Sequence, residues 1–118
     1  MNKLVSLILS LSISPVVCVA EGCSKVIPGY EESDTMYVVC EDLSGITQEE
    51  SNKLIKNIFS QYKGEPDEVF VFFVSSKEYV GKFEFPAEVW VADYYTHHNK
   101  LTLWPKVKEK TRAITIQW

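Results

Sequence analysis

The sequence predicts an α+β fold in which one amphipathic helix packs on a mostly antiparallel sheet of about five to six strands. Two observations predict it: a capped helical segment begins at residue 47, and β-branched and aromatic runs lie on both sides of it. The expected order is strand, helix, strand and then a series of further strands. Because strand–helix–strand crossovers are right-handed, we expect the first two strands to be parallel, either adjacent or with another strand between them.

The first 20 residues have the features of a signal peptide. Lys3 provides a positive charge, residues 4–17 are apolar apart from serines and one proline, and Cys18 and Ala20 place small residues before a cleavage site. A stretch of 14 residues is shorter than the roughly 20 that a membrane-spanning helix needs. We therefore expect cleavage after Ala20 and no transmembrane segment in the mature chain. The short leader is typical of bacteria and predicts a secreted, periplasmic product.

Cleavage would leave residues 21–118, which is enough chain for a single domain. Without Lys3 the chain has 11 basic residues against 16 acidic ones, a net charge of −5 when the histidines are neutral. This acidic balance argues against general nucleic-acid binding. Six Phe, six Tyr and three Trp residues argue against a disordered chain and predict a core rich in aromatic rings.

Two cysteines, Cys23 and Cys40, would remain after cleavage in an oxidising compartment. We expect them to form a disulfide that closes a loop of 17 residues. Such a cross-link stabilises a fold by about 3 kcal/mol in the chain-entropy model. A redox-active pair is the alternative, but the Cys-x-x-Cys spacing that would support it is missing.

The helix is the element that the sequence specifies most strongly. Thr47 and Glu50 form a capping box, because each side chain can accept a hydrogen bond from the backbone amide of the other residue. Gly64 and Pro66 are expected to end the helix. Five apolar residues recur at helical spacing and should face the sheet: Leu54, Ile55, Ile58, Phe59 and Tyr62.

The remaining elements follow from β-branched and aromatic runs between turn signals. Residues 21–35 are polar and contain Pro28-Gly29, so they are expected to form an arm or loop. In the last strand, Ile114, Ile116 and Trp118 share one face, which we expect to belong to the core. Strands are expected over residues 36–41, 68–74, 79–85, 88–96, 100–104 and 112–118.

No set of residues in the sequence forms a catalytic or metal-binding motif, and no cofactor is expected. His97 and His98 could bind a metal, but neighbouring strand residues point to opposite faces and no third ligand follows at a recognised spacing. An exposed hairpin tip is the favoured interpretation. Asp93 interrupts an apolar strand, where burial could raise its pKa and make it an acid or base. An Asp at a strand end that faces water or an aromatic hydroxyl is the more common case.

Three aromatic residues, Trp90, Tyr94 and Trp104, would lie on one side of the sheet if the hairpin loop has three residues. If these rings are exposed, they could stack on sugars or anchor a partner protein. If the helix covers them, they belong to the core, which is the favoured interpretation. A two-residue loop would instead place Leu101 and Leu103 on that side of the sheet, so the register of the hairpin decides which residues lie beside Trp90 and Tyr94.

Four cationic residues occur at alternate positions late in the chain. In an extended segment they would project to one side and could meet an acidic partner or an anionic lipid. A solvated loop, or an edge strand protected by lysines, is the favoured interpretation. These residues are Lys106, Lys108, Lys110 and Arg112.

These observations favour a small, exported, non-enzymatic binding protein whose partner is another protein. Small inhibitors, immunity proteins and accessory factors share this general form. One alternative is a small hydrolase-like enzyme built around Asp93, Tyr95, His97 and His98. The other alternative is a glycan- or cell-wall-binding module that uses an aromatic face formed by Trp90, Tyr94 and Trp104.

Overall fold

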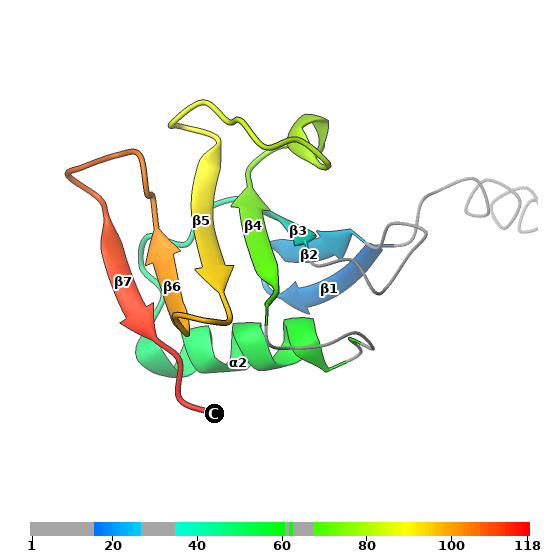
Figure 1. The fold of residues 1–118 in the computed structure, drawn as a ribbon, viewed down its shortest axis with the longest axis vertical. Helices are drawn as coiled ribbons and strands as arrows, with labels where there is room; N and C mark the ends of the chain where they lie inside the picture. The colour runs from blue at the N-terminus through cyan, green and yellow to red at the C-terminus, as the bar shows by residue number, and fades with distance from the viewer. Residues whose placement is uncertain (1–15, 27–34, 61, 63–67) are drawn as a thin grey trace, which may run out of the picture.

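The computed structural model describes residues 16–26, 35–60, 62 and 68–118. Within them, seven strands form one sheet, and a single α-helix packs across one of its faces (Figure 1). The elements are β1 (Val16–Ala20), β2 (Cys23–Val26), β3 (Thr35–Cys40), α2 (Gln48–Phe59), β4 (Phe70–Val74), a 3-10 turn η1 (Lys77–Tyr79), β5 (Trp90–Tyr95), β6 (Lys100–Leu103) and β7 (Arg112–Thr115).

The strands lie in the sheet in the same order as in the chain, from β1 to β7. β3 and β4 are parallel and adjacent, with α2 in the crossover between them, and the other neighbouring strands are antiparallel. The prediction of a helix on a sheet with a parallel first crossover is thus confirmed. The sheet is mixed, however, and has seven strands instead of five to six.

The start of α2 has the predicted capping box. The Thr47 hydroxyl accepts the Glu50 amide at 3.1 Å, and the Glu50 carboxylate accepts the Thr47 amide at 3.0 Å. These hydrogen bonds favour the ionised form and lower the pKa of Glu50. The helix ends at Phe59, earlier than predicted, with Ser60 as its C-cap. Gly64 and Pro66 lie outside the described residues.

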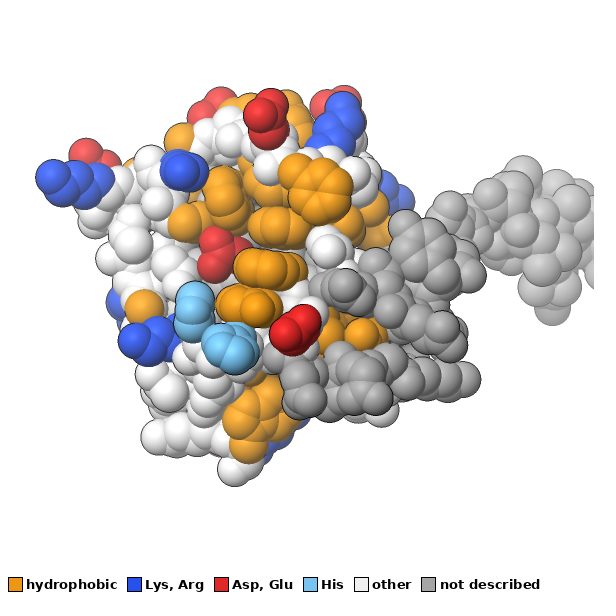
Figure 2. All heavy atoms as spheres, in the orientation of Figure 1, with side chains coloured by type: hydrophobic (Ala, Val, Ile, Leu, Met, Phe, Trp, Pro, Cys, Tyr) orange, Lys and Arg blue, Asp and Glu red, His pale blue; other side chains and the backbone are white. Residues whose placement is uncertain are grey.

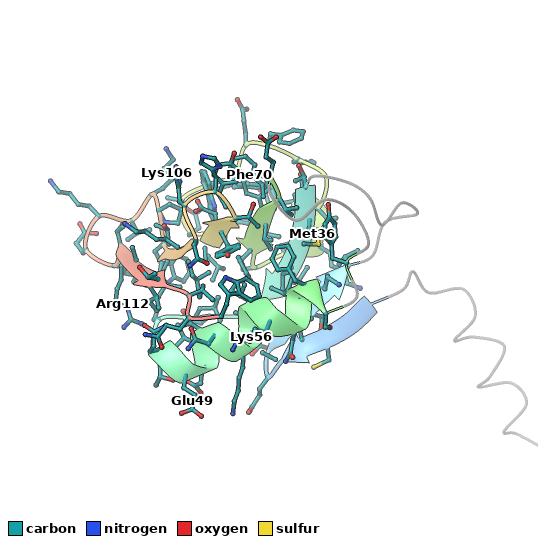
Figure 3. The ribbon with its side chains drawn as sticks, turned by 60° about the horizontal axis from the view of Figure 1, so that its bottom comes forward. Met36, Glu49, Lys56, Phe70, Lys106 and Arg112 are labelled. Carbon is teal, nitrogen blue, oxygen red and sulfur yellow. A yellow bond between two sulfur atoms is a disulfide. The ribbon has the colours of Figure 1, made fainter. Side chains whose placement is uncertain are left out.

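The core lies between α2 and the sheet. Leu54, Ile55 and Ile58 of the helix are completely buried against the inward residues of the strands. Glu49 and Lys56 project from the opposite side of α2, and Phe70 lies on the side of the sheet remote from the helix (Figure 3). Burial of each large apolar side chain contributes roughly 1.5–3 kcal/mol. The inward strand residues include Val38, Val71, Phe73, Ala92, Tyr94, Leu101, Leu103 and Ile114.

The predicted disulfide is present between Cys23 and Cys40, which are both buried. The two residues are directly opposite each other in the β2–β3 pair. This pairing also corrects the expectation that residues 21–35 form an arm or loop, because residues 23–26 of that segment are strand β2.

The strand expected over residues 79–85 is not formed. Ser76 caps the short turn η1, and Gly81 follows with a φ of 89°, a left-handed conformation that interrupts extended chain. The segment instead folds back on the sheet, where the Tyr37 hydroxyl donates to the carbonyl of Lys82 at 2.7 Å.

The C-terminal strand is integral to the sheet, as predicted, although β7 is shorter than expected. Ile114 and Ile116 are buried, whereas Trp118 is 64% exposed and does not belong to the core. Asn99 holds this end in place. Its side chain donates to the Ile116 carbonyl at 2.8 Å and accepts from the Tyr94 hydroxyl at 2.7 Å and from the Trp118 indole at 2.9 Å.

β1 lies within the segment predicted to be the end of the signal peptide. It pairs with β2, its Val19 side chain is buried in the core, and Asn57 donates to the Val19 carbonyl at 3.0 Å. Cleavage after Ala20 remains a prediction. No helix within the described ranges has the length and apolar character needed to cross a membrane.

Candidate functional site

The face of the sheet opposite α2 has a continuous series of aromatic rings in contact, which we call the aromatic face. Figure 2 shows hydrophobic side chains gathered over this side of the sheet, with the two histidines at the edge of the group. The rings come from β3, β4, β5 and the segment that connects β4 to β5. They are Tyr37, Phe70, Phe72, Tyr79, Phe83, Phe85, Trp90 and Tyr95.

Strand alternation places the centre of the aromatic face. In β4, Val71 and Phe73 point into the core, so Phe70 and Phe72 point outward. Phe70 lies opposite Tyr95 of β5, and their rings stack with centroids 4.1 Å apart and planes 5° from parallel. Such cross-strand aromatic pairs stabilise a sheet and hold both rings in fixed positions.

Trp90 joins this face because of an irregularity in the β4–β5 pairing. The register shifts between Phe73 and Val74, and the Trp90 ring then lies 6.1 Å from Phe72 and 5.3 Å from Phe85. The Lys106 ammonium lies over the indole, 5.6 Å from its centroid. The indole N–H is buried and makes no hydrogen bond within the described structure, which costs about 1–3 kcal/mol.

Two rings of the aromatic face are strongly exposed. Phe83 exposes 72% of its surface and Phe70 exposes 42%, while Phe72, Phe85 and Tyr95 are half-buried. Isolated exposed apolar residues are ordinary, but contiguous exposed apolar patches in soluble proteins are commonly interaction sites. The aromatic face is therefore the candidate functional site.

Asp93 lies in the same face, directly between Phe72 of β4 and Thr102 of β6. Its half-buried position removes water from the carboxylate and raises the pKa from 3.8 to about 6. No hydrogen bond or ion pair from any described residue reaches this carboxylate. It borders a hollow of about 390 Å³ that is also lined by Tyr95, His98, Lys100 and Thr102.

The structure brings together some of the polar residues that the sequence suggested as a site. Asp93, Tyr95 and His98 line one hollow, and the rings of His97 and His98 both lie beside Tyr95 at the exposed hairpin tip. No hydrogen bond joins Asp93 to His98. In the described part of the chain, no three His, Cys, Asp or Glu side chains are grouped as metal ligands.

Trp90, Tyr94 and Trp104 do not share a face. The register pairs Tyr94 with Leu101 and Ala92 with Leu103, as a two-residue loop would have done. Tyr94 is buried on the helix side of the sheet at 1% exposure. Trp104 follows Leu103 with a positive φ of 47°, which reverses the side expected from alternation, and its indole, 7% exposed, donates to the Ser44 hydroxyl at 2.9 Å. Both residues belong to the core, which is the favoured interpretation. Trp90, brought to the other side by the register shift, is the one member of this trio in the aromatic face.

The four late cations do not form a one-sided row, because residues 104–111 make turns instead of extended chain. The Val107 amide donates to the Trp104 carbonyl, and the Lys110 amide donates to Val107. The side chains then separate. Lys106 lies over Trp90, Lys110 lies 4.9 Å from the centroid of Trp104, Arg112 donates to the Ile46 carbonyl at 2.8 Å, and Lys108 is exposed.

The outward-facing phenylalanines of the aromatic face are not among the site residues predicted from the sequence. Residues 68–74 are an almost continuous apolar run, so the expected strand is apolar on both faces, and the alternation of Phe70 and Phe72 with Val71 and Phe73 does not stand out. One pattern in the sequence could have identified them: up to Phe72, the alternate positions of this strand that face one side are phenylalanine.

The aromatic face can bury apolar surface of a ligand and offer it one carboxylate. Comparison of the chain with protein-family models, with curated proteins and with solved structures finds no match.

Proposed function

We propose that the chain is an exported, non-enzymatic binding protein whose aromatic face anchors another protein. One observation carries the proposal: Phe83 and Phe70 are exposed beside further rings, on the side of the sheet that α2 does not cover. Large aromatic side chains provide much of the binding free energy at protein interfaces. The predicted leader supports an extracytoplasmic location, and the disulfide suits it.

The composition of the aromatic face favours a protein partner over a sugar or a reaction. Its two most exposed rings are phenylalanines, which cannot donate or accept hydrogen bonds with sugar hydroxyls. The indole N–H of Trp90, which could donate, is buried. Asp93 has no hydrogen-bonded base or nucleophile beside it among the described residues, so the hydrolase interpretation has no catalytic pair to rest on.

A glycan-binding role is the second candidate. The hollow beside the Phe70–Tyr95 stack favours it, because Asp93, Lys100 and Thr102 line the hollow and could bind hydroxyl groups next to a flat ring. This alternative predicts that Tyr95 and Asp93 matter for binding and that Phe83 does not.

The test compares capture of a partner by two variants of the exported protein. Phe70→Thr combined with Phe83→Ser removes both exposed rings, and Trp118→Ser removes a similarly exposed ring, Trp118, that contacts Phe59 beside α2. The native protein and Trp118→Ser should capture the same protein from periplasmic extract at physiological salt. The double variant should bind it at least ~30-fold more weakly, because interface hot spots contribute about 2 kcal/mol or more.

Thermal unfolding of the double variant gives the control for folding. Capture that is unchanged in a folded double variant would refute the proposal. Titration of tryptophan fluorescence with peptidoglycan fragments examines the second candidate, whose signal should disappear in Asp93→Asn and persist in the single variant Phe83→Ser.

A further inference from the structure

β1 is the strand that the predicted cleavage after Ala20 would remove from the sheet. It is an edge strand, and it pairs antiparallel with β2 in a register that places Val16 opposite Val26 and Cys18 opposite Ser24. The same cleavage would leave Cys23 and the whole of β2 in the mature chain. The boundary between leader and mature protein thus runs between two paired strands.

β1 completes the core as well as the sheet. The Val19 side chain is 4% exposed and belongs to the same apolar cluster as Leu54 of α2. The Val19 carbonyl accepts the Asn57 side-chain amide at 3.0 Å. Beside this strand lies a hollow of about 430 Å³, whose apolar lining includes Val19, Ala20, Leu43 and Leu54.

Loss of β1 would therefore open a groove between β2 and α2, which we call the acceptor groove. The edge of β2 would expose the backbone donors and acceptors that now pair with β1, and the place of Val19 would become an apolar slot beside Leu54. An uncovered strand edge next to an apolar slot readily accepts another strand.

We propose that the acceptor groove of the mature protein takes an extended segment of a partner protein as a new edge strand, with β1 occupying its place in this structure. The proposal rests on the predicted leader, as the proposed function does, but it uses a surface separate from the aromatic face. It adds a second mode of binding, in which main-chain hydrogen bonds supply affinity and one side-chain slot supplies selectivity.

The structure indicates the chemistry of the incoming segment. It should run antiparallel to β2 and place a β-branched apolar residue of the size of valine at the position of Val19. In the mature protein the rim of the hollow would have three carboxylates, from Glu21, Asp42 and Glu50, against two ammonium groups, from Lys53 and the new N-terminus at Glu21. A lysine or arginine beside the apolar residue would complement this charge.

A second copy of the chain fits the groove poorly. Pairing of β2 with another β2 would offer only Cys23 and Lys25 on the side that faces α2. Cys23 is held in the disulfide, and Lys25 is buried with its ammonium donating to the Ile58 carbonyl at 3.0 Å. Neither residue can supply the apolar side chain that the slot requires.

The experiment uses the protein purified after export. Mass spectrometry should first find Glu21 at its N-terminus. The probe is a labelled peptide with the sequence of β1, carrying Cys18→Ser and an added lysine after Ala20. It should bind saturably and slow hydrogen exchange of the amides of residues 23–26.

Three variants examine the geometry of the groove. The peptide with Val19→Asp should bind at least ~10-fold more weakly, because a charge would enter an apolar slot. In the protein, Asn57→Ala should weaken binding ~5-fold through loss of one hydrogen bond. Lys56→Ala, which changes the adjacent exposed residue, should leave binding unchanged and serves as the matched control.

A mature chain that retains residues 16–20 would overturn the proposal, and so would the absence of peptide binding at millimolar concentration. Binding without protection of β2, or equal binding by the Val19→Asp peptide, would also overturn it. The Phe70→Thr, Phe83→Ser variant should bind the peptide like the native protein. If this variant captures the partner protein as well as the native protein does and also binds the peptide normally, only the proposed role of the aromatic face is refuted.

Discussion

Replacement of Asn99 by alanine should destabilise the domain strongly, because one side chain joins the β5–β6 hairpin to the C-terminus. The change removes the donor to the Ile116 carbonyl and the acceptor shared by Tyr94 and Trp118. It also places a Cβ-bearing residue without a compensating polar group at a φ of 55°.

The magnitude follows from the burial of the groups involved. Loss of the partner of the part-buried Tyr94 hydroxyl and loss of the hydrogen bond to Ile116 each cost about 1 kcal/mol, whereas the exposed Trp118 indole can turn to water. The left-handed backbone adds about 1 kcal/mol for alanine. The total is about 3 kcal/mol, a large part of the 5–15 kcal/mol that holds a typical domain together.

Urea and thermal unfolding of three variants would measure this loss of stability. Asn99→Ala should lower the melting temperature by more than ~10 °C. Asn99→Gly should recover about 1 kcal/mol, because glycine tolerates the left-handed conformation. The exposed neighbour His98→Ala should change stability by less than about 0.5 kcal/mol. An Asn99→Ala protein that unfolds like the native one would show that this side chain does not hold the C-terminus.

Two further predictions concern β7 and Asp93. A chain cut after Lys110 loses buried Ile114 and Ile116 and should fail to fold or should aggregate through the edge of β6; cooperative melting within a few degrees of the full chain would contradict this. Because the pKa of Asp93 is raised from 3.8 to about 6, the folded state holds a proton that the unfolded state releases between these values. Stability should therefore fall as the pH rises from about 4 to about 6 and then level off. Asp93→Asn should abolish that fall in a series of melting curves, and an unchanged profile would assign it to other groups.

Local signals in the sequence were sufficient for the helix start, the hairpin and the disulfide. The capping box of Thr47 and Glu50 involves residues three apart, so no tertiary information is needed to find it. Cys23 and Cys40 were the two cysteines after the predicted cleavage site, which left a single pairing. The parallel direction of β3 and β4 was predicted from the crossover through α2, whereas the sequence left open whether they are adjacent or have another strand between them.

The aromatic face depended on register, which a single sequence does not fix. The shift between Phe73 and Val74 moves Trp90 to the opposite side from Tyr94, although strict alternation would place the two together. The positive φ of Trp104 likewise reverses the side on which its ring would lie by alternation after Leu103, and the ring is buried. For residues 79–85, weak alternation suggested a strand, but the positive φ of Gly81 is incompatible with a continuous one.

β1 was not predicted because the same apolar residues suit both a signal peptide and a β-strand. The valines near the end of the predicted leader satisfy the apolar requirement of export, and valine is also among the best strand formers. Once these residues are assigned to a leader, nothing local calls for a second interpretation.

The order of the strands also bears on how quickly the domain can form. Each strand pairs with its neighbour in the chain, so most pairings close short loops, and the β3–β4 pairing across α2 spans the longest connection. A sheet whose pairings join chain neighbours should fold faster than a sheet of the same size whose pairings are non-local. In a chain that enters an oxidising compartment from its N-terminus, β2 and β3 emerge before the rest of the sheet. Cys23 and Cys40 can then meet as a hairpin, and the disulfide can form before β4 to β7 have left the translocation channel.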